Sequence, residues 1–217
     1  MSTPNLEDPK QVLTYLTPAI LAVRTGLDHS VSLADSFFAT NELPFDPWLW
    51  SHVARFGTSV HLRKEEPKNE PKEWERGRIL ANSGIELKRM PLVLRVLKAR
   101  GDGPPHPGLS LAKKLFYSRN GFPRLPITVG GAIIPEVANY ILDWATNKER
   151  ELFLALSKPT GIWQYGQRPK LEWRRAFTQP EGEDLRFIPG EDDLPTEDVF
   201  DPSEFEEDHE SGDGAAE

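Results

Sequence analysis

Aromatic and basic residues alternate along residues 163–175, and this pattern could carry chemistry. Arginine and lysine neutralise phosphates, while flat rings stack on bases, which is worth about 1–3 kcal/mol per base in single-stranded nucleic acid. Glu172 is the one acidic residue in this segment. We therefore predict a nucleic-acid contact made by Trp163, Tyr165, Arg168, Lys170, Trp173, Arg174 and Arg175. A structural alternative stays open, in which the tryptophans anchor the segment to the core.

Two further basic sets precede this segment. The first, which we add to the predicted nucleic-acid site, consists of Lys113, Lys114, Arg119 and Arg124. The second consists of Lys88, Arg89, Arg95, Lys98 and Arg100. Solvated helix surfaces also carry such residues, so these sets alone are weaker signals than the aromatic and basic segment.

Catalytic and metal motifs give no comparable signal. The sequence has no cysteine, and its five histidines lack the His-x-x-x-His spacing of a helical metal site. Adjacent glycines at 130 and 131 lack the rest of a phosphate-binding loop. We predict no catalytic residue, no metal site and no cofactor. The enzymatic alternative rests on Glu136 and Asp143, which a helix would place near one face.

Charge divides the chain into two parts. Residues 1–180 hold 25 basic and 18 acidic residues, whereas residues 181–217 hold one basic and sixteen acidic residues. The first part is therefore near +7 and the second near −15. Such asymmetry indicates a polyanionic partner or an acidic interaction arm. We predict a disordered N-terminus over 1–8, a folded body over 9–180 and a disordered acidic tail over 181–217.

The sequence predicts that the elements that position these residues are mainly helices. Asp8-Pro9 and Asp46-Pro47 have the residue types of a helix N-cap and first helical position. Apolar spacing predicts helices over 9–21, 28–39, 45–56, 73–82, 91–100, 109–119, 135–144 and 146–156, and brief strands near 59–62 and 127–129. We therefore expect an all-α or predominantly α protein. The glycines and prolines at 101–108 suggest a division into lobes at 9–100 and 109–180.

These features favour a non-enzymatic protein that binds single-stranded nucleic acid, RNA in particular, in the manner of a coat protein or nucleoprotein. Its acidic tail would regulate that binding, and homo-oligomers are expected. The main alternative is a protein-interaction or assembly factor that docks a protein partner through the acidic tail. The chain has no secretory signal and no apolar run of about 20 residues. We therefore expect a cytoplasmic or otherwise intracellular protein that does not enter membranes.

Overall fold

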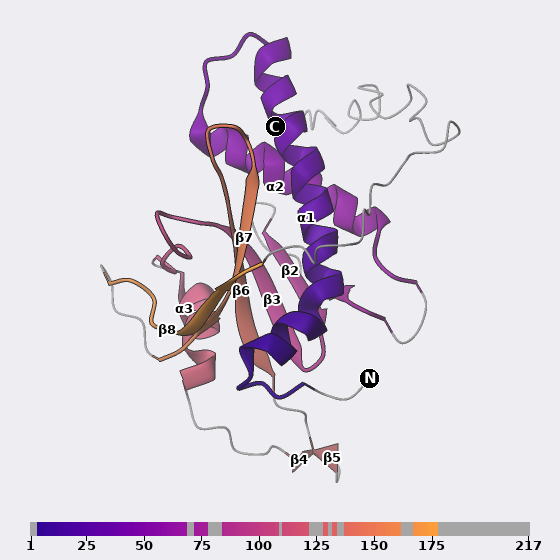
Figure 1. Ribbon diagram of the computed structural model, residues 1–217, viewed down its shortest axis with the longest axis vertical. Helices are drawn as coiled ribbons and strands as arrows, with labels where there is room; N and C mark the ends of the chain where they lie inside the picture. Colours follow the sequence, from indigo (N-terminus) through magenta and orange to yellow (C-terminus); the bar gives the residue numbers. More distant parts are fainter. Residues whose placement is uncertain are drawn as a thin grey trace, which may run out of the picture. The chain divides into compact units, whose positions relative to one another are not determined.

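Two long helices open the chain in the computed structural model (Figure 1), which describes residues 4–68, 72–77, 84–108, 110–121, 128–129, 132–133, 137–161 and 167–177. Helix α1 covers Pro9–Thr40 and helix α2 covers Pro47–Lys64. Both predicted caps are confirmed. The Asp8 carboxylate accepts from the Lys10 amide at 2.9 Å, and that of Asp46 accepts from the Trp48 amide at 2.7 Å.

Both helices run further than the sequence predicts. Helix α1 continues through Pro18, although proline removes one backbone hydrogen bond from a helix interior. Helix α2 continues through Gly57, where we expected it to end. Gly57 serves the packing of the two helices: a Cβ atom at this position would lie 2.7 Å from the Ser30 hydroxyl of α1. Glycine therefore lets the two helices approach closely.

A six-stranded mixed sheet forms the rest of the fold. Its order is β1-β2-β3-β6-β7-β8, with β3 and β6 parallel and all other neighbours antiparallel. The six strands are β1 (Glu75–Arg76), β2 (Ile85–Arg89), β3 (Leu92–Lys98), β6 (Ala138–Thr146), β7 (Leu152–Pro159) and β8 (Leu171–Ala176). The remaining elements are helix α3 (Leu111–Ser118), a 3₁₀ turn (Arg119–Gly121) and the two-stranded pair β4 (Thr128–Val129) and β5 (Ala132–Ile133).

The expectation of a predominantly helical protein is therefore wrong. The predicted helices at 91–100, 135–144 and 146–156 correspond largely to strands β3, β6 and β7. These strands are covered on both faces, so their sequences are nearly continuous apolar runs that periodicity does not separate from a buried helix. The sheet also draws strands from both sides of residues 101–108, where the sequence suggested a division between lobes.

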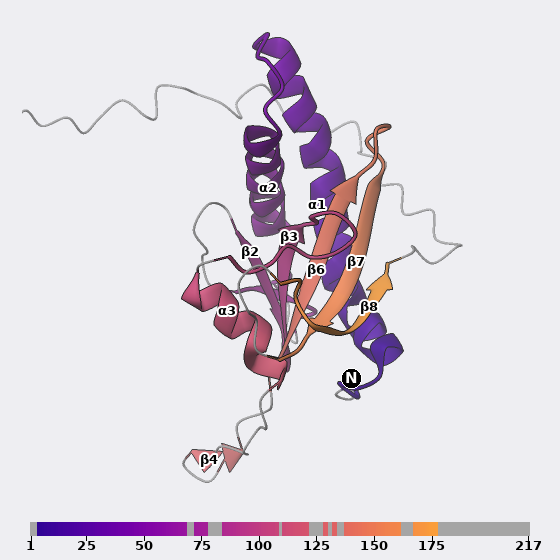
Figure 2. The ribbon, with the colours of Figure 1, turned by 90° about the vertical axis from the view of Figure 1, so that its left-hand side faces the viewer.

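The two faces of the sheet carry different side chains. Under α1 and α2 the face is apolar, and alternate residues such as Leu94, Leu142 and Leu156 join the main core. Under α3 lies a smaller apolar group formed by Phe116, Tyr117 and Ile141, with Val93 and Leu97 against it. Figure 2 shows α1 and α3 on opposite sides of the sheet. Strand alternation thus directs neighbouring residues of one strand into two separate environments.

Replacing Gly57 with Ala should destabilise the pair of long helices. The new methyl group would also lie 3.0 Å from the Ser30 Cβ, so a rigid part of α1 would have to move. Overpacking of this kind costs about 1–3 kcal/mol, which urea unfolding would measure.

Gly103→Ala is the control, because a Cβ atom there meets no atom within 4 Å. Adding Ser30→Gly to Gly57→Ala should recover part of the loss. A Gly57→Ala protein as stable as the native chain would contradict the close helix contact.

Candidate anion-binding pocket

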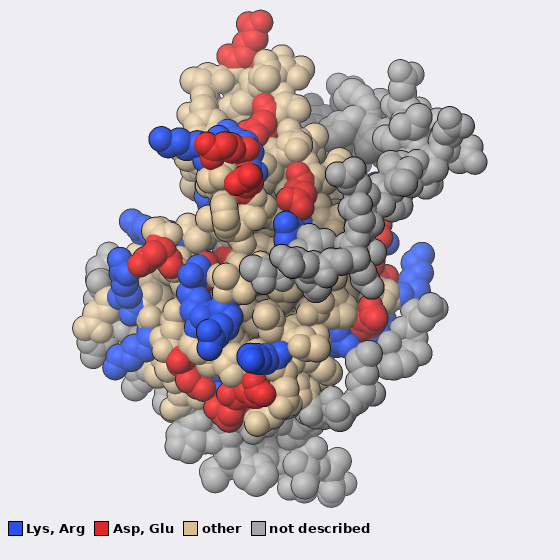
Figure 3. All heavy atoms as spheres, in the orientation of Figure 1, with Lys and Arg blue, Asp and Glu red and all other residues tan. Residues whose placement is uncertain are grey.

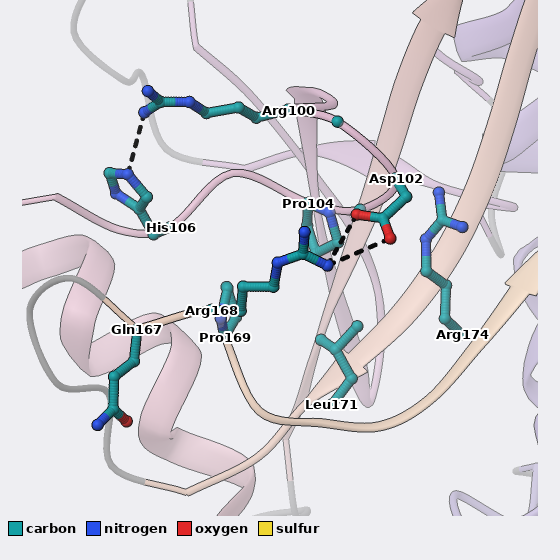
Figure 4. A pocket seen from close by; sticks show the side chains of 11 residues that line it. Arg100, Asp102, Pro104, His106, Gln167, Arg168, Pro169, Leu171 and Arg174 are labelled. Atoms are coloured by element: carbon teal, nitrogen blue, oxygen red, sulfur yellow. Dashed lines mark hydrogen bonds and ion pairs between the residues drawn. The ribbon is translucent and has the colours of Figure 1, made fainter.

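A cavity of about 460 Å³ opens between the loop at residues 100–106 and the segment at residues 167–174. The loop follows β3, and the segment leads into the edge strand β8. Three arginines line the cavity, namely Arg100, Arg168 and Arg174. Figure 4 shows the side chains of Arg168 and Arg174 on either side of Asp102. Two segments that are distant in sequence thus bring their cations to one cavity.

Arg174 is held by the buried carboxylate of Asp143. One guanidinium nitrogen lies 2.6 Å from Asp143 Oδ1, and its Nε lies 3.3 Å from Oδ2. The Asp143 side chain is 1% exposed, whereas that of Arg174 is 36% exposed. The pair therefore crosses from the interior under α3 to the rim of the cavity. The predicted carboxylate pair of Glu136 and Asp143 is not on a helix, since Asp143 belongs to β6, and Glu136 lies outside the described residues.

Strand register explains why Arg174 reaches this position. Ser157 pairs with Arg174 across β7 and β8, and with Ile141 across β7 and β6. Paired residues of neighbouring strands point to the same face of a sheet. Arg174 therefore faces α3 with Ile141, and Asp143, two residues further along β6, shares that face.

Arg168 and Arg100 make more open contacts. The Arg168 guanidinium lies 3.0 Å from Asp102, and both side chains are mostly exposed. Arg100 contacts the His106 Nε2 atom at 3.0 Å, which requires that nitrogen to accept the hydrogen bond. Exposed ion pairs contribute little to folding. These cations can therefore change partner when an anion enters, at small cost to the fold.

The charges in and beside the cavity shift three pKa values. A hydrogen bond from its own backbone and the Arg168 charge lower the pKa of Asp102. The hydrogen bond to Asp143 raises the pKa of Arg174, and the charges of Asp143 and Asp102 add to this. Burial, together with the Asp143 charge, raises the pKa of the Tyr117 hydroxyl. Arg174 therefore stays cationic and Asp102 stays anionic throughout the physiological range.

This arrangement is suited to binding an oxyanion. Guanidinium groups present several N–H donors in a planar fork that matches phosphate and carboxylate oxygens. Within the described ranges, no group of three or more histidine, aspartate or glutamate side chains is placed to hold a metal ion.

The predicted nucleic-acid residues divide between several places. Arg168 and Arg174 line the cavity, while Lys170 and Arg175 are exposed near it in the chain. Trp173 packs against the main core, with its ring 5.6 Å from that of Tyr140. The structural alternative is therefore right for this tryptophan. Trp163, Tyr165 and Arg124 lie outside the described residues.

The residues on and after α3 do not join this cavity. Lys113 and Lys114 belong to α3, and Arg119 begins the turn that follows it. Arg119 instead lines a second cavity of about 570 Å³, shared with Glu86 and Lys88 of β2. The predicted set of basic residues is thus spread over more than one surface.

Sequence reasoning missed half of the pocket. Arg100 belonged to a basic set that we left outside the predicted site, and His106 lay in a segment taken for a linker. Gln167 lies beside the predicted arginines and also lines the cavity. One sequence feature could have indicated that this loop belongs to the site. Arg100 stands directly before a run of glycines and prolines, which are residues typical of a turn.

Comparisons with known proteins leave the chemistry to be inferred from these residues, because no family model, curated protein or solved structure matches the chain. Among the described helices, none combines the length and the apolarity needed to cross a membrane.

Replacing Arg174 and Arg168 one at a time should show which of these pocket arginines also stabilises the fold. Among the described residues, Arg174→Ala leaves the buried Asp143 carboxylate with one hydrogen-bond partner, the Ser157 hydroxyl at 3.4 Å. The substitution should lower the free energy of unfolding by about 2–3 kcal/mol. Arg168→Ala should leave the urea midpoint unchanged because its ion pair is exposed. Equal effects of the two substitutions would contradict this division.

Proposed function

We propose that this chain is a non-enzymatic protein that binds single-stranded nucleic acid, RNA in particular, through its phosphates. The observation that carries the proposal is the cavity lined by Arg100, Arg168 and Arg174. Two of these arginines hold contacts that an incoming phosphate could replace, and the third is fixed by Asp143. A phosphodiester backbone offers one negative charge per nucleotide, so several arginines close together favour it.

The positive charge of residues 1–180 supports the same partner. A net charge near +7 attracts polyanions over distances comparable with the Debye length, about 8 Å at physiological salt. Contacts to phosphates carry no sequence information of their own. We therefore expect binding with little sequence preference. A coat-like role, in which many copies cover one strand, is the more specific form of this proposal.

A second candidate function is a protein-interaction or assembly factor. Exposed apolar side chains on the two long helices favour it, since contiguous apolar surface often marks a protein contact. The largest of those on α1 and α2 are Leu33, Phe37, Trp48 and Phe56. Docking of a protein partner by the acidic tail would belong to the same function.

Titration of labelled oligouridine with the full chain tests the first proposal. Binding should weaken steeply with salt, with a slope of about 0.7 per phosphate contact in a plot of log affinity against log salt. Arg168→Ala should remove one phosphate contact and so lower that slope by about 0.7. Arg100→Ala should lower it by about the same amount. Fluorescence anisotropy at several salt concentrations measures both, and oligothymidine separates RNA from DNA preference.

Arg63→Ala is the matched control, because Arg63 lies near the end of α2 and does not line the cavity. It should change the slope less than either pocket variant. Micromolar or weaker binding that does not respond to salt would overturn the proposal.

Deleting residues 181–217 separates the two candidate functions. Sixteen acidic residues compete with phosphates for cations, so the shortened chain should bind oligouridine more tightly if the first function is right. Under the second function the deletion should instead abolish capture of a protein partner. Unchanged oligouridine affinity would exclude a regulatory role of the tail.

A further inference from the structure

The start of α2 exposes two large aromatic rings. Phe45 is 55% exposed and Trp48 is 69% exposed. The Trp48 ring lies against His52 one turn later, with ring centroids 4.1 Å apart. Figure 3 shows both acidic and basic side chains on the upper part of the molecule, where α1 and α2 lie. A flat, open ring held by a neighbour is suited to stacking against a planar ligand.

Cations from three different elements lie near the start of α2. The Lys98 amine, at the end of β3, lies 4.8 Å from the Trp50 ring centre and donates to the Ser51 hydroxyl at 2.7 Å. The Arg150 guanidinium, from the turn between β6 and β7, lies 5.5 Å from the Phe45 ring centre. Each cation is therefore held against an aromatic ring.

Arg55 extends the same group along α2. Its guanidinium contacts the His52 ring nitrogens at 3.0 and 3.1 Å, so Trp48, His52 and Arg55 form a continuous row. Burial lowers the pKa of His52, and the Arg55 charge adds to this effect. A neutral His52 ring can pack against Trp48, at an interplanar angle of 53°, and accept a hydrogen bond from Arg55.

This surface holds the cations Lys98, Arg55 and Arg150 and two carboxylates, those of Asp35 and Asp46. Asp35 pairs with Arg150 at 2.9 Å and also accepts from the Trp50 indole. Among the described residues, no carboxylate lies within ion-pair distance of Lys98 or Arg55. Burial lowers the pKa of Lys98, and the charges of Arg150 and Arg55 lower it further. The group therefore has cationic character that an anion would relieve.

We infer that Phe45 and Trp48 form a base-stacking site for single-stranded nucleic acid, with phosphates on Lys98 and Arg55. The inference rests on the proposed function and adds an exposed aromatic ring to the phosphate contacts of the arginine pocket. Trp173 packs against the core, and the described residues that line the pocket include no tryptophan, tyrosine or phenylalanine. Trp48 provides an open ring, whereas Trp163 and Tyr165 of the predicted segment lie outside the described residues.

Chain connectivity brings the two sites to one end of the sheet. Lys98 ends β3, and Arg100 of the pocket follows two residues later, so their Cα atoms are within about 7 Å. Lys98 faces α2, as its bond to Ser51 shows. A strand bound in the pocket could continue around the end of β3 to reach Trp48.

A second copy of the chain is a less suitable partner for this surface. In a two-fold contact the same patch meets itself. Lys98, Arg55 and Arg150 would then face their own copies, and like charges brought together oppose association. Phosphates instead complement these cations, while bases cover the rings.

The test uses the full chain, labelled oligouridine of about 12 nucleotides, and three variants. Trp48→Ala should weaken binding about ten-fold to a hundred-fold, which is the range expected when one stacked base is lost. Trp48→Phe should recover most of the affinity, because it keeps an aromatic face. Phe56→Ala is the matched control, since Phe56 is an exposed ring of the same helix at 59% and none of the described cations lies over it.

The outcomes separate this inference from the proposed function. If the native chain binds and Arg168→Ala weakens binding while Trp48→Ala does not, the stacking site is wrong and the phosphate pocket stands. If the native chain does not bind, both are overturned. Light scattering measures whether the native chain forms a dimer. If it does, and if Trp48→Ala dissociates the dimer without changing the oligouridine affinity, the inference is overturned. The surface would then be a contact between two copies of the chain.

Discussion

The ion pair between Asp143 and Arg174 is the interaction on which the arrangement of the pocket depends. Asp143 is buried in β6, and its carboxylate needs a cation close by. Arg174 supplies it from β8, the edge strand, across the intervening strand β7. The need to neutralise one buried charge thus fixes the position of an edge strand. The segment that precedes β8, which carries Arg168, is positioned as a result.

The same pair divides the arginines of the pocket by role. Arg174 contributes to both folding and the cavity, whereas Arg168 and Arg100 make open contacts. A second buried pair, between Glu86 and Arg95, lies on the same face of the sheet with a separation of 3.0 Å. The face under α3 therefore holds two buried ion pairs, while the face under α1 is mainly apolar.

The helix-start signals in the sequence were reliable, whereas the helix ends and the distant strand pairings were not predicted. The two Asp-Pro helix starts depend on a few adjacent residues, and both form as predicted. Strand β3 was predicted to be a helix because both of its faces are buried, so Leu92–Lys98 has no clear polar alternation. Its identity is decided by pairing with β6, more than forty residues later.

The site followed the same rule. Arg168 and Arg174 could be chosen from their local charge, but Arg100 joins them only once the sheet has formed. Composition also cannot say which tryptophan is open. Trp173 lies in an aromatic and basic segment yet packs into the core, whereas Trp48 lies in an apolar segment and is exposed. Exposure depends on tertiary packing, which the local sequence does not contain.

Photo-crosslinking of the full chain to a 4-thiouridine oligonucleotide, followed by peptide mapping, tests the central claim most directly. The account predicts crosslinked peptides from residues 100–106 and 167–174, with a further crosslink near Trp48, all lost at high salt. Failure to crosslink under conditions of low salt, or crosslinks confined to other parts of the chain, would contradict it.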